Sequence, residues 1–386
     1  MRILLLGLML NISCALYPIP AAAQSADAGR EPLRVYIGTY TSGDSKGIYQ
    51  MRLNTRTGAL ENLGLACAVE NPSFLALHPN KPVLYAVGEM ASGGVVSAFS
   101  IEAGTGSLRL LNQQSSKGKG PCHVAVSRAG QNVLCANYGG GSVAVLPLDA
   151  EGRLREATAF IQHQGASMHP QRQQGPHTHS VTLDKAGRFV FAADLGLDKI
   201  MIYRLDEAQG ALTPNDPAFA ALKPGAGPRH FAFHPEGRFA YVVNELDNTV
   251  TAFSYDAASG ILETLHSAGT LPNDFKGENS TAEIRVHPSG RYVYCSNRGH
   301  DSIAIFAIDS ASGRLTPLGH TYTRGRVPRN FNIDPSGKYL LAANQESGTV
   351  AVFHINLDTG LLEPLGEPVE VPTPVCVLFV TSPPNR

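Results

Sequence analysis

The sequence predicts an all-β fold, a seven-bladed β-propeller in which each blade is a sheet of four antiparallel strands. A unit of about fifty residues recurs along the chain and is clearest in residues 228–262. Two markers of this unit, a turn glycine and a first-strand motif, recur independently of each other. The two ends of the chain also carry complementary parts of one unit, as a closed ring requires.

Residues 228–262 show how one unit is expected to fold. Apolar residues alternate on both sides of the tight turn 234–237, which predicts two short strands. A polar loop at 244–248 leads to a third strand, and the turn 256–260 leads to a fourth. Each unit is therefore expected to form one four-stranded blade.

Both markers give the number of blades. The glycine before the fourth strand recurs at intervals of 46 to 58 residues. These glycines are Gly58, Gly106, Gly152, Gly210, Gly260, Gly313 and Gly360. The first-strand motif begins at Pro72, Pro121, Thr178, Pro228, Thr281 and Pro328, and a last copy without the turn begins at Pro374. Seven blades follow.

The two ends of the chain match different strands of the repeat unit, and this predicts how the ring closes. Residues 34–40 resemble the second strand of a unit, whereas the segment from Pro374 resembles a first strand. Joined in space, the C-terminal strand completes blade one. We therefore expect residues 34–386 to form a single propeller domain.

Residues 1–23 do not belong to the repeats. Arg2 precedes a short apolar run, and a small-residue site ends at Ala23, which is the order of a secretory signal peptide. The apolar core of about ten residues is too short for a transmembrane helix of roughly twenty. We expect cleavage before Gln24, a linker over residues 24–33, and a mature protein that is periplasmic or secreted.

Composition excludes several classes of partner. The formal net charge is −1 and 16% of the residues are charged, which argues against nucleic acid and against an anionic membrane surface. Of six cysteines, five remain after the predicted cleavage, and an odd number without paired spacing predicts buried free thiols. We expect a monomer that binds a small molecule, without a cofactor and without a membrane or nucleic acid partner.

The order of the strands locates the place where chemistry can occur. In an antiparallel pair, the start of the first strand and the end of the second lie at the same edge, and the first strand lines the channel of a propeller. These positions therefore surround one mouth of the channel. The first strands contribute Ser73, Cys122, His123, His179, Arg229, His230, Glu283 and Arg329. The ends of the second strands contribute Glu89, Asn137, Tyr138, Asp194, Asn244, Glu245, Asn297, Arg298, Asn344 and Gln345.

The charged residues of the mouth are harder to explain structurally than its asparagines. An asparagine at a strand end is most simply a loop residue whose side chain bonds nearby backbone. His78, His234 and His287 precede the first turn at the far edge of the blade and are expected to be turn or packing residues. Buried arginines and carboxylates are costly without partners. The mouth is therefore either a functional site or a structural ring of ion pairs.

Three runs of the sequence resemble a known family. They are GPHTHSVTLDKAGRFVFAADLGLDKI from Gly175, GPRHFAFHPEGRFAYVVNEL from Gly227 and VPRNFNIDPSGKYLLAANQ from Val327. They are similar to the bacterial lactonase family of seven-bladed propellers, which includes a type of 6-phosphogluconolactonase and is related to the eukaryotic carboxymuconate cyclase. The resemblance extends over nearly the whole chain after the predicted signal peptide.

The resemblance implies a hydrolase that opens a lactone ring at the mouth of the channel. The lactone would be the 6-phosphogluconolactone type, another sugar-derived lactone or another acidic lactone. Two alternatives stay open: a carboxymuconate-type lactonising cyclase or isomerase, and a secreted propeller that binds a ligand or partner without turnover.

A catalytic set is also implied by the resemblance, namely a histidine, two arginines and a glutamate that match His179, Arg229, Arg298 and Glu245. Lactone opening needs a base for water, a group that stabilises the oxyanion and an acid for the leaving alkoxide. We expect Glu245 or His179 to be the base and the other the acid, with Arg229 facing the oxyanion. Arg298 and Arg329 are expected to hold an anionic part of the substrate. The remaining predicted substrate-binding residues are His230, Glu283 and His123.

A metal site is not predicted. Four histidines lie close together in sequence, but their spacing matches no zinc motif and no carboxylate or thiolate lies among them. These histidines are His163, His169, His177 and His179.

We expect residues 1–23 to be absent from the exported protein, because a small-residue site follows the short apolar core. Intact-mass measurement of protein recovered from the periplasm or the medium should give a chain that begins at Gln24. Ala23→Arg is the matched control, since it removes the small residue at the cleavage site and should leave the chain unprocessed. Retention of Met1 in the exported protein would contradict the prediction.

Overall fold

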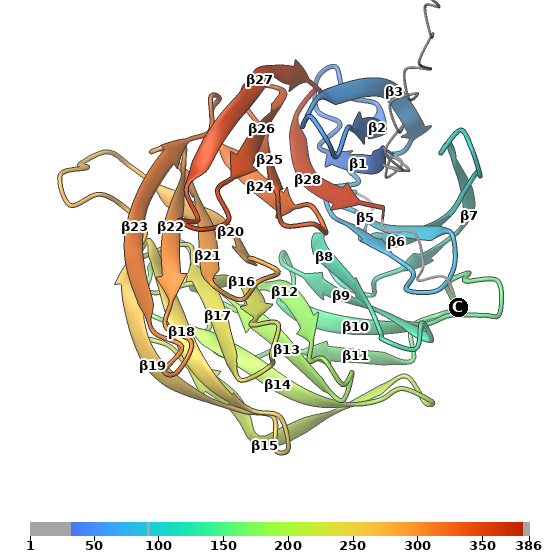
Figure 1. Ribbon diagram of the computed structural model, residues 1–386. Helices are drawn as coiled ribbons and strands as arrows, with labels where there is room; N and C mark the ends of the chain where they lie inside the picture. The colour runs from blue at the N-terminus through green and yellow to red at the C-terminus, as the bar shows by residue number, and fades with distance from the viewer. Residues whose placement is uncertain (1–31, 91–92, 381–386) are drawn as a thin grey trace, which may run out of the picture. The chain divides into compact units, whose positions relative to one another are not determined.

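The computed structural model describes residues 32–90 and 93–380, and in these ranges the chain forms 28 β-strands and no helix. The strands make seven four-stranded antiparallel sheets arranged around a common centre (Figure 1). The predicted seven-bladed propeller is therefore confirmed. The predicted signal peptide and most of the predicted linker lie outside the described residues.

Each blade runs from an inner strand to an outer strand (Figure 1). Blade one consists of β28 (Pro374–Phe379), β1 (Leu33–Thr39), β2 (Gly47–Leu53) and β3 (Leu60–Ala68). Blade two consists of β4 (Leu75–Leu77), β5 (Val83–Gly88), β6 (Val95–Ile101) and β7 (Leu108–Ser115). Blade three consists of β8 (Pro121–Val126), β9 (Asn132–Asn137), β10 (Ser142–Pro147) and β11 (Ala159–Gln162).

The other four blades repeat this order. Blade four consists of β12 (Thr178–Leu183), β13 (Phe189–Asp194), β14 (Lys199–Asp206) and β15 (Ala211–Ala221). Blade five consists of β16 (Pro228–Phe233), β17 (Phe239–Asn244), β18 (Thr249–Asp256) and β19 (Ile261–Gly269). Blade six consists of β20 (Ser280–Val286), β21 (Tyr292–Arg298), β22 (Ser302–Ile308) and β23 (Leu315–Tyr322). Blade seven consists of β24 (Pro328–Ile333), β25 (Tyr339–Asn344), β26 (Thr349–Ile355) and β27 (Leu362–Glu370).

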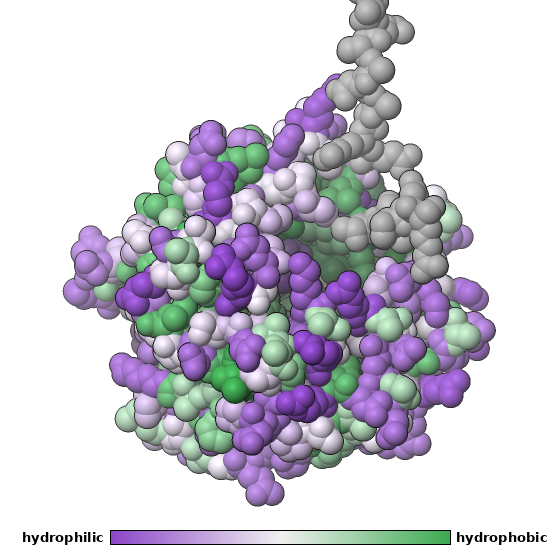
Figure 2. All heavy atoms as spheres, turned by 60° about the horizontal axis from the view of Figure 1, so that its bottom comes forward, coloured by the Kyte–Doolittle hydropathy of each residue, from purple (hydrophilic) through white to green (hydrophobic). Residues whose placement is uncertain are grey.

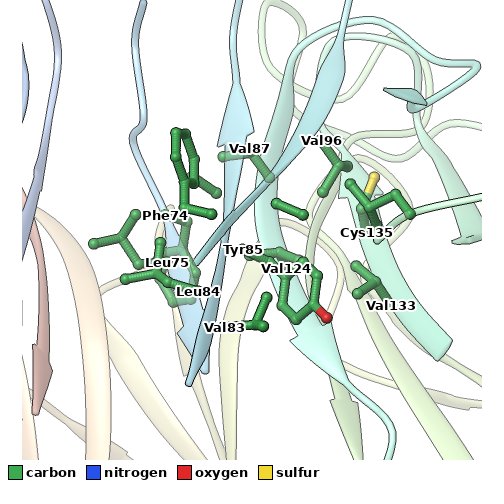
Figure 3. Packing of buried hydrophobic residues seen from close by; sticks show 14 of the residues in the cluster. Phe74, Leu75, Val83, Leu84, Tyr85, Val87, Val96, Val124, Val133 and Cys135 are labelled. Atoms are coloured by element: carbon green, nitrogen blue, oxygen red, sulfur yellow. The ribbon is translucent and has the colours of Figure 1, made fainter. Parts of the chain in front are cut away.

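The hydrophobic core is divided among the interfaces between blades. Every residue of β17 is buried, because blades four and six cover its two faces. Its residues Ala240 and Val242 pack in the cluster with Phe191 of blade four, whereas Tyr241 packs in the cluster with Val293 of blade six. Figure 3 shows an equivalent interface, in which β5 of blade two packs against blade three. The second strands are apolar on both faces for this reason.

The marker glycines join neighbouring blades. Gly313 of blade six has a φ of 71°, which favours glycine, and a Cβ at this position would lie 2.4 Å from the ring of Phe239 in blade five. The hydroxyl of Tyr241 donates to the Gly313 carbonyl oxygen at 3.1 Å. The same bond links Tyr294 of blade six to Gly360 of blade seven at 2.8 Å. The recurring glycine therefore allows close packing between blades as well as the turn.

The histidines of the first turn also join blades. Nδ1 of His234 accepts the Glu236 N–H at 3.2 Å, and its Nε2 lies 2.9 Å from the Gly290 carbonyl oxygen of the next blade. His78 and His287 make the equivalent pair of contacts. All three are buried, and the prediction that they are turn or packing residues is confirmed.

The ring is closed by the C-terminal strand, as predicted. β28 pairs with β1 from Val35 opposite Phe379 to Thr39 opposite Pro374. Each inner strand also contacts the inner strand of the next blade all the way round, including β24 with β28 and β28 with β4. The two ends of the propeller chain are therefore held in one sheet.

The five cysteines of the described residues are free thiols, as predicted. Burial raises the pKa of Cys135 and Cys376 to about 12, so these thiols stay protonated at neutral pH. The prediction of buried thiols is right for four of the five. Cys67 is only partly buried, because it lies on the outer strand β3.

Hydrophilic residues cover most of the molecular face in Figure 2, with apolar residues in small groups between them. The most exposed large apolar side chains are those of Met168 and Tyr322. No helix that could cross a membrane occurs in residues 32–90 and 93–380.

We expect deletion of residues 374–386 to lower the free energy of unfolding by several kcal/mol, because it removes β28 and exposes the edge of β1 and the neighbouring inner strands. Thermal unfolding followed by circular dichroism measures the effect. Deletion of residues 381–386 alone leaves β28 intact and is the control. If both truncated proteins melt at the same temperature, closure by β28 does not stabilise the fold.

Candidate active site

A β-bulge at the start of the first strands selects the side chains that face the mouth. In blade five, Arg229 has no partner across the ladder, although its neighbours Pro228 and His230 do. The same irregularity leaves three further residues unpaired in blades three, four and seven, namely Cys122, His179 and Arg329. A bulge bends the strand and re-aims its side chains. The side chains of these residues therefore need not alternate between the two faces of the blade and can face the mouth.

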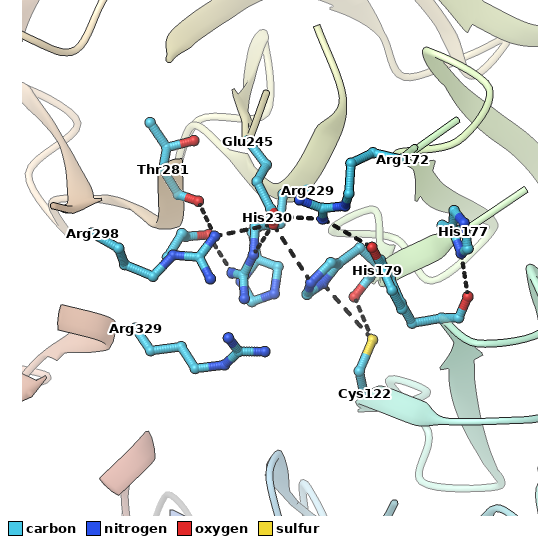
Figure 4. A network of polar contacts seen from close by, with 12 residues as sticks. Cys122, Arg172, His177, His179, Arg229, His230, Glu245, Thr281, Arg298 and Arg329 are labelled. Carbon is cyan, nitrogen blue, oxygen red and sulfur yellow. Dashed lines mark hydrogen bonds and ion pairs between the residues drawn. The ribbon is translucent and has the colours of Figure 1, made fainter. Parts of the chain in front are cut away.

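Glu245 lies at the centre of the charged residues of the mouth (Figure 4). Its Oε2 is 3.0 Å from Nε of Arg229 and 3.1 Å from Nη2 of Arg298, and its Oε1 accepts a 2.6 Å hydrogen bond from Nη2 of Arg172. The predicted pair of Arg229 and Glu245 is thus present as an ion pair. Burial alone would raise the pKa of Glu245, but the three guanidinium groups lower it to about 2. The carboxylate is therefore ionised throughout the neutral range.

Arg172 was not predicted from the sequence. It lies in the connection between β11 and β12, and its Nη2 also donates to the hydroxyl of Tyr138 at 3.0 Å. The connection is anchored by Gln173, which is fully buried and donates to the Leu195 carbonyl oxygen at 2.8 Å. A long loop next to the mouth was the only sign of this residue in the sequence, since no strand register assigns its position.

His179 lies between Glu245 and Cys122 (Figure 4). Its Nε2 is 4.0 Å from Oε2 of Glu245, and its Nδ1 is 3.8 Å from Sγ of Cys122. Burial lowers the pKa of His179 well below its usual value, and the positive charges of Arg229 and Arg329 act in the same direction. The imidazole is therefore neutral at pH 7.

Arg329 has no carboxylate within ion-pair distance among residues 32–90 and 93–380. Its Nη2 donates to the hydroxyl of Tyr40 at 3.1 Å, and its guanidinium carbon lies 5.3 Å from the centre of the Tyr40 ring. The same hydroxyl donates to Glu89 at 3.2 Å, and Glu89 also accepts a short hydrogen bond from Ser73. Tyr40 directly follows β1, the second strand of blade one. The ends of the second strands lie at the mouth, so the same strand phase places Tyr40 there.

A second group of polar residues lies beside these. Nδ1 of His230 is 3.1 Å from Oε1 of Glu283, and the other carboxylate oxygen bonds Asn330 and lies 3.4 Å from Nη2 of Arg285. Burial opposes ionisation of Glu283, but Arg285 and His230 lower its pKa to about 2. Both predicted residues, His230 and Glu283, therefore belong to one buried network.

Two adjoining hollows are present at the mouth. The larger cavity has a volume of about 360 Å³, within the range of small-molecule sites. It is lined by Tyr40, Glu89, Cys122, Tyr138, Arg172, His179, Glu245, Ser280, Arg298 and Arg329. A small recess of about 10 Å³ is lined by Tyr40, Ser73, Phe74, Glu89, Cys122, His179, Arg229, His230, Arg329, Asn330 and Val375. The two share five lining residues, so they form one site.

Most predicted site residues are brought together here. Those that line a hollow are Glu245, His179, Arg229, Arg298, Arg329 and His230. Glu283 borders neither hollow but contacts His230. His123 also borders neither, and its ring stacks on that of Phe74 at 4.1 Å between centres. Within residues 32–90 and 93–380, no group of three histidines, cysteines or carboxylates is placed to hold a metal ion.

We expect Glu245→Gln to lower the free energy of unfolding at pH 7 by roughly 3–5 kcal/mol, because it leaves three arginines without their shared counter-charge. The folded pKa of Glu245 lies below the ordinary value of 4.5, so its ionised form stabilises the fold above that value. The difference between the two proteins should shrink as the pH falls from 4.5 towards 2. Urea unfolding at several pH values measures it.

Glu263→Gln is the matched control for this prediction. Glu263 lies in the same blade, on the outer strand β19, and is exposed, so its replacement should change stability by less than about 0.5 kcal/mol. A Glu245→Gln protein as stable as this control would show that the arginines of the mouth do not depend on Glu245.

Comparisons with known proteins agree with the fold. The family described as "Lactonase, 7-bladed beta-propeller" matches residues 34–379. The chain is 40% identical over 345 residues to a 6-phosphogluconolactonase of Bacillus subtilis, covering 89% of this chain and 97% of that protein. It is 33% identical over 307 residues to a 6-phosphogluconolactonase of Formosa agariphila, covering 78% of this chain and 86% of that one.

A solved structure shows the same arrangement. The periplasmic gluconolactonase of Pseudomonas aeruginosa superimposes with a TM-score of 0.86 at 33% identity, covering 91% of this chain and 99% of the other. The family match spans nearly all of the described residues, and the sequence identities are too high for a shared fold alone. The chain belongs to the lactonase family of seven-bladed β-propellers.

Proposed function

We propose that the protein hydrolyses a lactone at the channel mouth, with a sugar-derived or other acidic lactone as substrate. The observation that carries the proposal is the excess of positive charge around the two adjoining hollows. Four guanidinium groups and two carboxyl groups meet there, and they belong to Arg172, Arg229, Arg298, Arg329, Glu89 and Glu245. The names of the relatives, 6-phosphogluconolactonase and gluconolactonase, support the same substrate class.

Arg329 is the best candidate for holding an anionic group of the substrate. Its charge is not neutralised by a carboxylate at ion-pair distance, unlike that of Arg229 or Arg298. A guanidinium group can hold a carboxylate or a phosphate with two parallel hydrogen bonds. Arg298 supplies a further donor, because its buried Nε has no hydrogen-bond partner among the described residues.

The negative charge of the opening lactone develops on the carbonyl oxygen. Arg229 lines the recess and is held by Glu245 through Nε and by the Ala282 carbonyl oxygen through Nη1. A cation fixed in this way needs little reorganisation during the reaction, which favours stabilisation of the transition state. We assign Arg229 to the oxyanion.

Glu245 fits a positioning role better than that of a base. A carboxylate with a pKa of about 2 is a weak proton acceptor at neutral pH. Its three ion pairs instead orient Arg172, Arg229 and Arg298 towards the cavity. His179, whose neutral imidazole lines both hollows, is the better candidate of the two for proton transfer, and we place it as the group that relays a proton to the leaving alkoxide.

We also propose that hydrolysis takes place outside the cytoplasm. The order of residues 1–23 fits a secretory signal peptide, and one structural relative is a periplasmic enzyme. Nothing in the comparisons favours the cyclase or the non-catalytic alternative over lactone hydrolysis.

We expect Arg229→Ala to lower kcat by roughly 100-fold or more, because it removes a charge that acts on the oxyanion. Arg329→Ala should mainly raise KM, and only for a charged lactone, because uniform binding is lost. The measurement is acid release by the mature protein from glucono-δ-lactone and from its 6-phosphate.

Arg326→Ala is the control for both substitutions. Arg326 precedes β24 on the same rim, but its side chain is 70% exposed and pairs loosely with Glu346, so neither kinetic constant should change. Wild-type turnover of every hydrolysed lactone by both Arg229→Ala and Arg329→Ala would show that the mouth is not the active site. Absence of turnover by the unaltered protein would reject lactone hydrolysis itself.

A further inference from the structure

His230 combines a carboxylate partner on one ring nitrogen with no partner on the other. Nδ1 lies 3.1 Å from Oε1 of Glu283. Nε2 is buried and has no hydrogen-bond partner among the described residues, and only 5% of the residue is exposed. A buried nitrogen without a partner is costly, so this one requires an explanation.

The recess beside His230 is large enough to hold a water molecule that could bond Nε2. Its volume of about 10 Å³ is room for about one water molecule. Polar groups on several sides could fix that water, because Arg229, His179 and Ser73 also line the recess. The recess shares residues with the larger cavity, including Arg329, so a water held there would lie next to a bound lactone.

The surroundings of His230 differ from those of His179 in a way that matters for accepting a proton. His179 faces Arg229 and Arg329, and its contact with Glu245 is 4.0 Å long. His230 lies within hydrogen-bonding distance of a carboxylate that is itself held by Asn330 and Arg285. An imidazole backed by a carboxylate is stabilised when it becomes positively charged.

We propose that His230 is the general base that activates the hydrolytic water, and that Glu283 is the positioning residue that holds its Nδ1–H. His230 has this role only if the protein hydrolyses lactones as proposed above. The assignment differs from the one expected from the sequence, in which the base was Glu245 or His179 and His230 was a substrate-binding residue.

The step balances in protons and bonds. Nε2 of His230 takes a proton from the water as its oxygen forms a bond to the lactone carbonyl carbon, which gives a tetrahedral oxyanion beside Arg229. The carbonyl then re-forms and the ring C–O bond breaks. The neutral imidazole of His179 takes up the proton of the His230 imidazolium on one ring nitrogen, through solvent in the cavity, as it gives the proton of its other nitrogen to the leaving alkoxide. Both histidines are then neutral again. The product is the hydroxy acid, which releases one proton to solvent.

The charged groups around His230 set the pH at which it can work. Burial lowers its pKa to about 4, Glu283 opposes this, and Arg229 and Arg285 add to it. Its ring also contacts His123 of β8 and His179 of β12 at centre distances of 5.3 and 5.2 Å. Because the base must be neutral, kcat/KM should fall as the pH is lowered through about 4. Loss of the Glu283 charge should move this inflection to lower pH.

The test uses His230→Ala and Glu283→Gln in the mature protein, with the lactone that the unaltered protein hydrolyses fastest. We expect His230→Ala to lower kcat by roughly 100-fold or more with little change in KM. Added imidazole, which fits the space left by the side chain, should raise the kcat of His230→Ala by at least about tenfold. Glu283→Gln should lower kcat less and shift the pH inflection downwards.

His234→Gln is the matched control for loss of folding. His234 directly follows the same strand, is equally buried, and bonds the next blade at the far end, so its replacement should lower the melting temperature without changing kcat or the pH inflection. If His230→Ala keeps kcat within about threefold of the unaltered protein, His230 is not the base. A loss of activity with neither imidazole rescue nor a pH shift in Glu283→Gln also overturns the assignment. Absence of all lactone turnover in the unaltered protein rejects the proposed function, and the base with it.

Discussion

The pairing of β28 with β1 is the constraint on which the rest of the structure depends. It places the last strand of the chain inside the first blade, so that each inner strand has a neighbour on both sides. A closed ring gives all first strands one axis and one direction. The starts of these strands therefore meet at one mouth, although Cys122 and Arg329 are separated by most of the propeller chain. The site is thus a consequence of ring closure.

Closure also explains why the mouth is both charged and stable. The bulged residues are directed into a space with little solvent, where Arg229 is only 2% exposed, and an unpaired cation there would be costly. Glu245 offsets this cost for three arginines at once. The sequence left a structural ring of ion pairs and a functional site as alternatives. The contacts of Glu245 form such a ring and are compatible with the proposed site as well. Arg329 is not one of the three arginines paired with Glu245. Its positive charge is therefore available to an anionic substrate in the proposed function.

The sequence predicts the fold and most of the site because strand phase determines the position of a residue in a repeat. Glu245 and Arg229 could be paired in advance, since they lie at facing ends of one hairpin. Arg172 could not be placed, because it reaches Glu245 from a loop without register. The contact of His230 with Glu283 crosses from one blade to the next and depends on bulges, which no periodic pattern reveals.

The two buried glutamates of the site illustrate how partners assign roles to identical side chains. Burial raises the pKa of both Glu245 and Glu283, but the neighbouring positive groups outweigh it and bring both values to about 2, so neither gains a proton near neutral pH. They differ in what they hold. The nearest partners of Glu245 are three arginines, which do not release protons in proteins. Glu283 instead holds the imidazole of His230, whose pKa is lowered to about 4. Glu245 therefore fits the role of fixing charge in the site, whereas the network of Glu283 and His230 fits the proposed role in proton transfer.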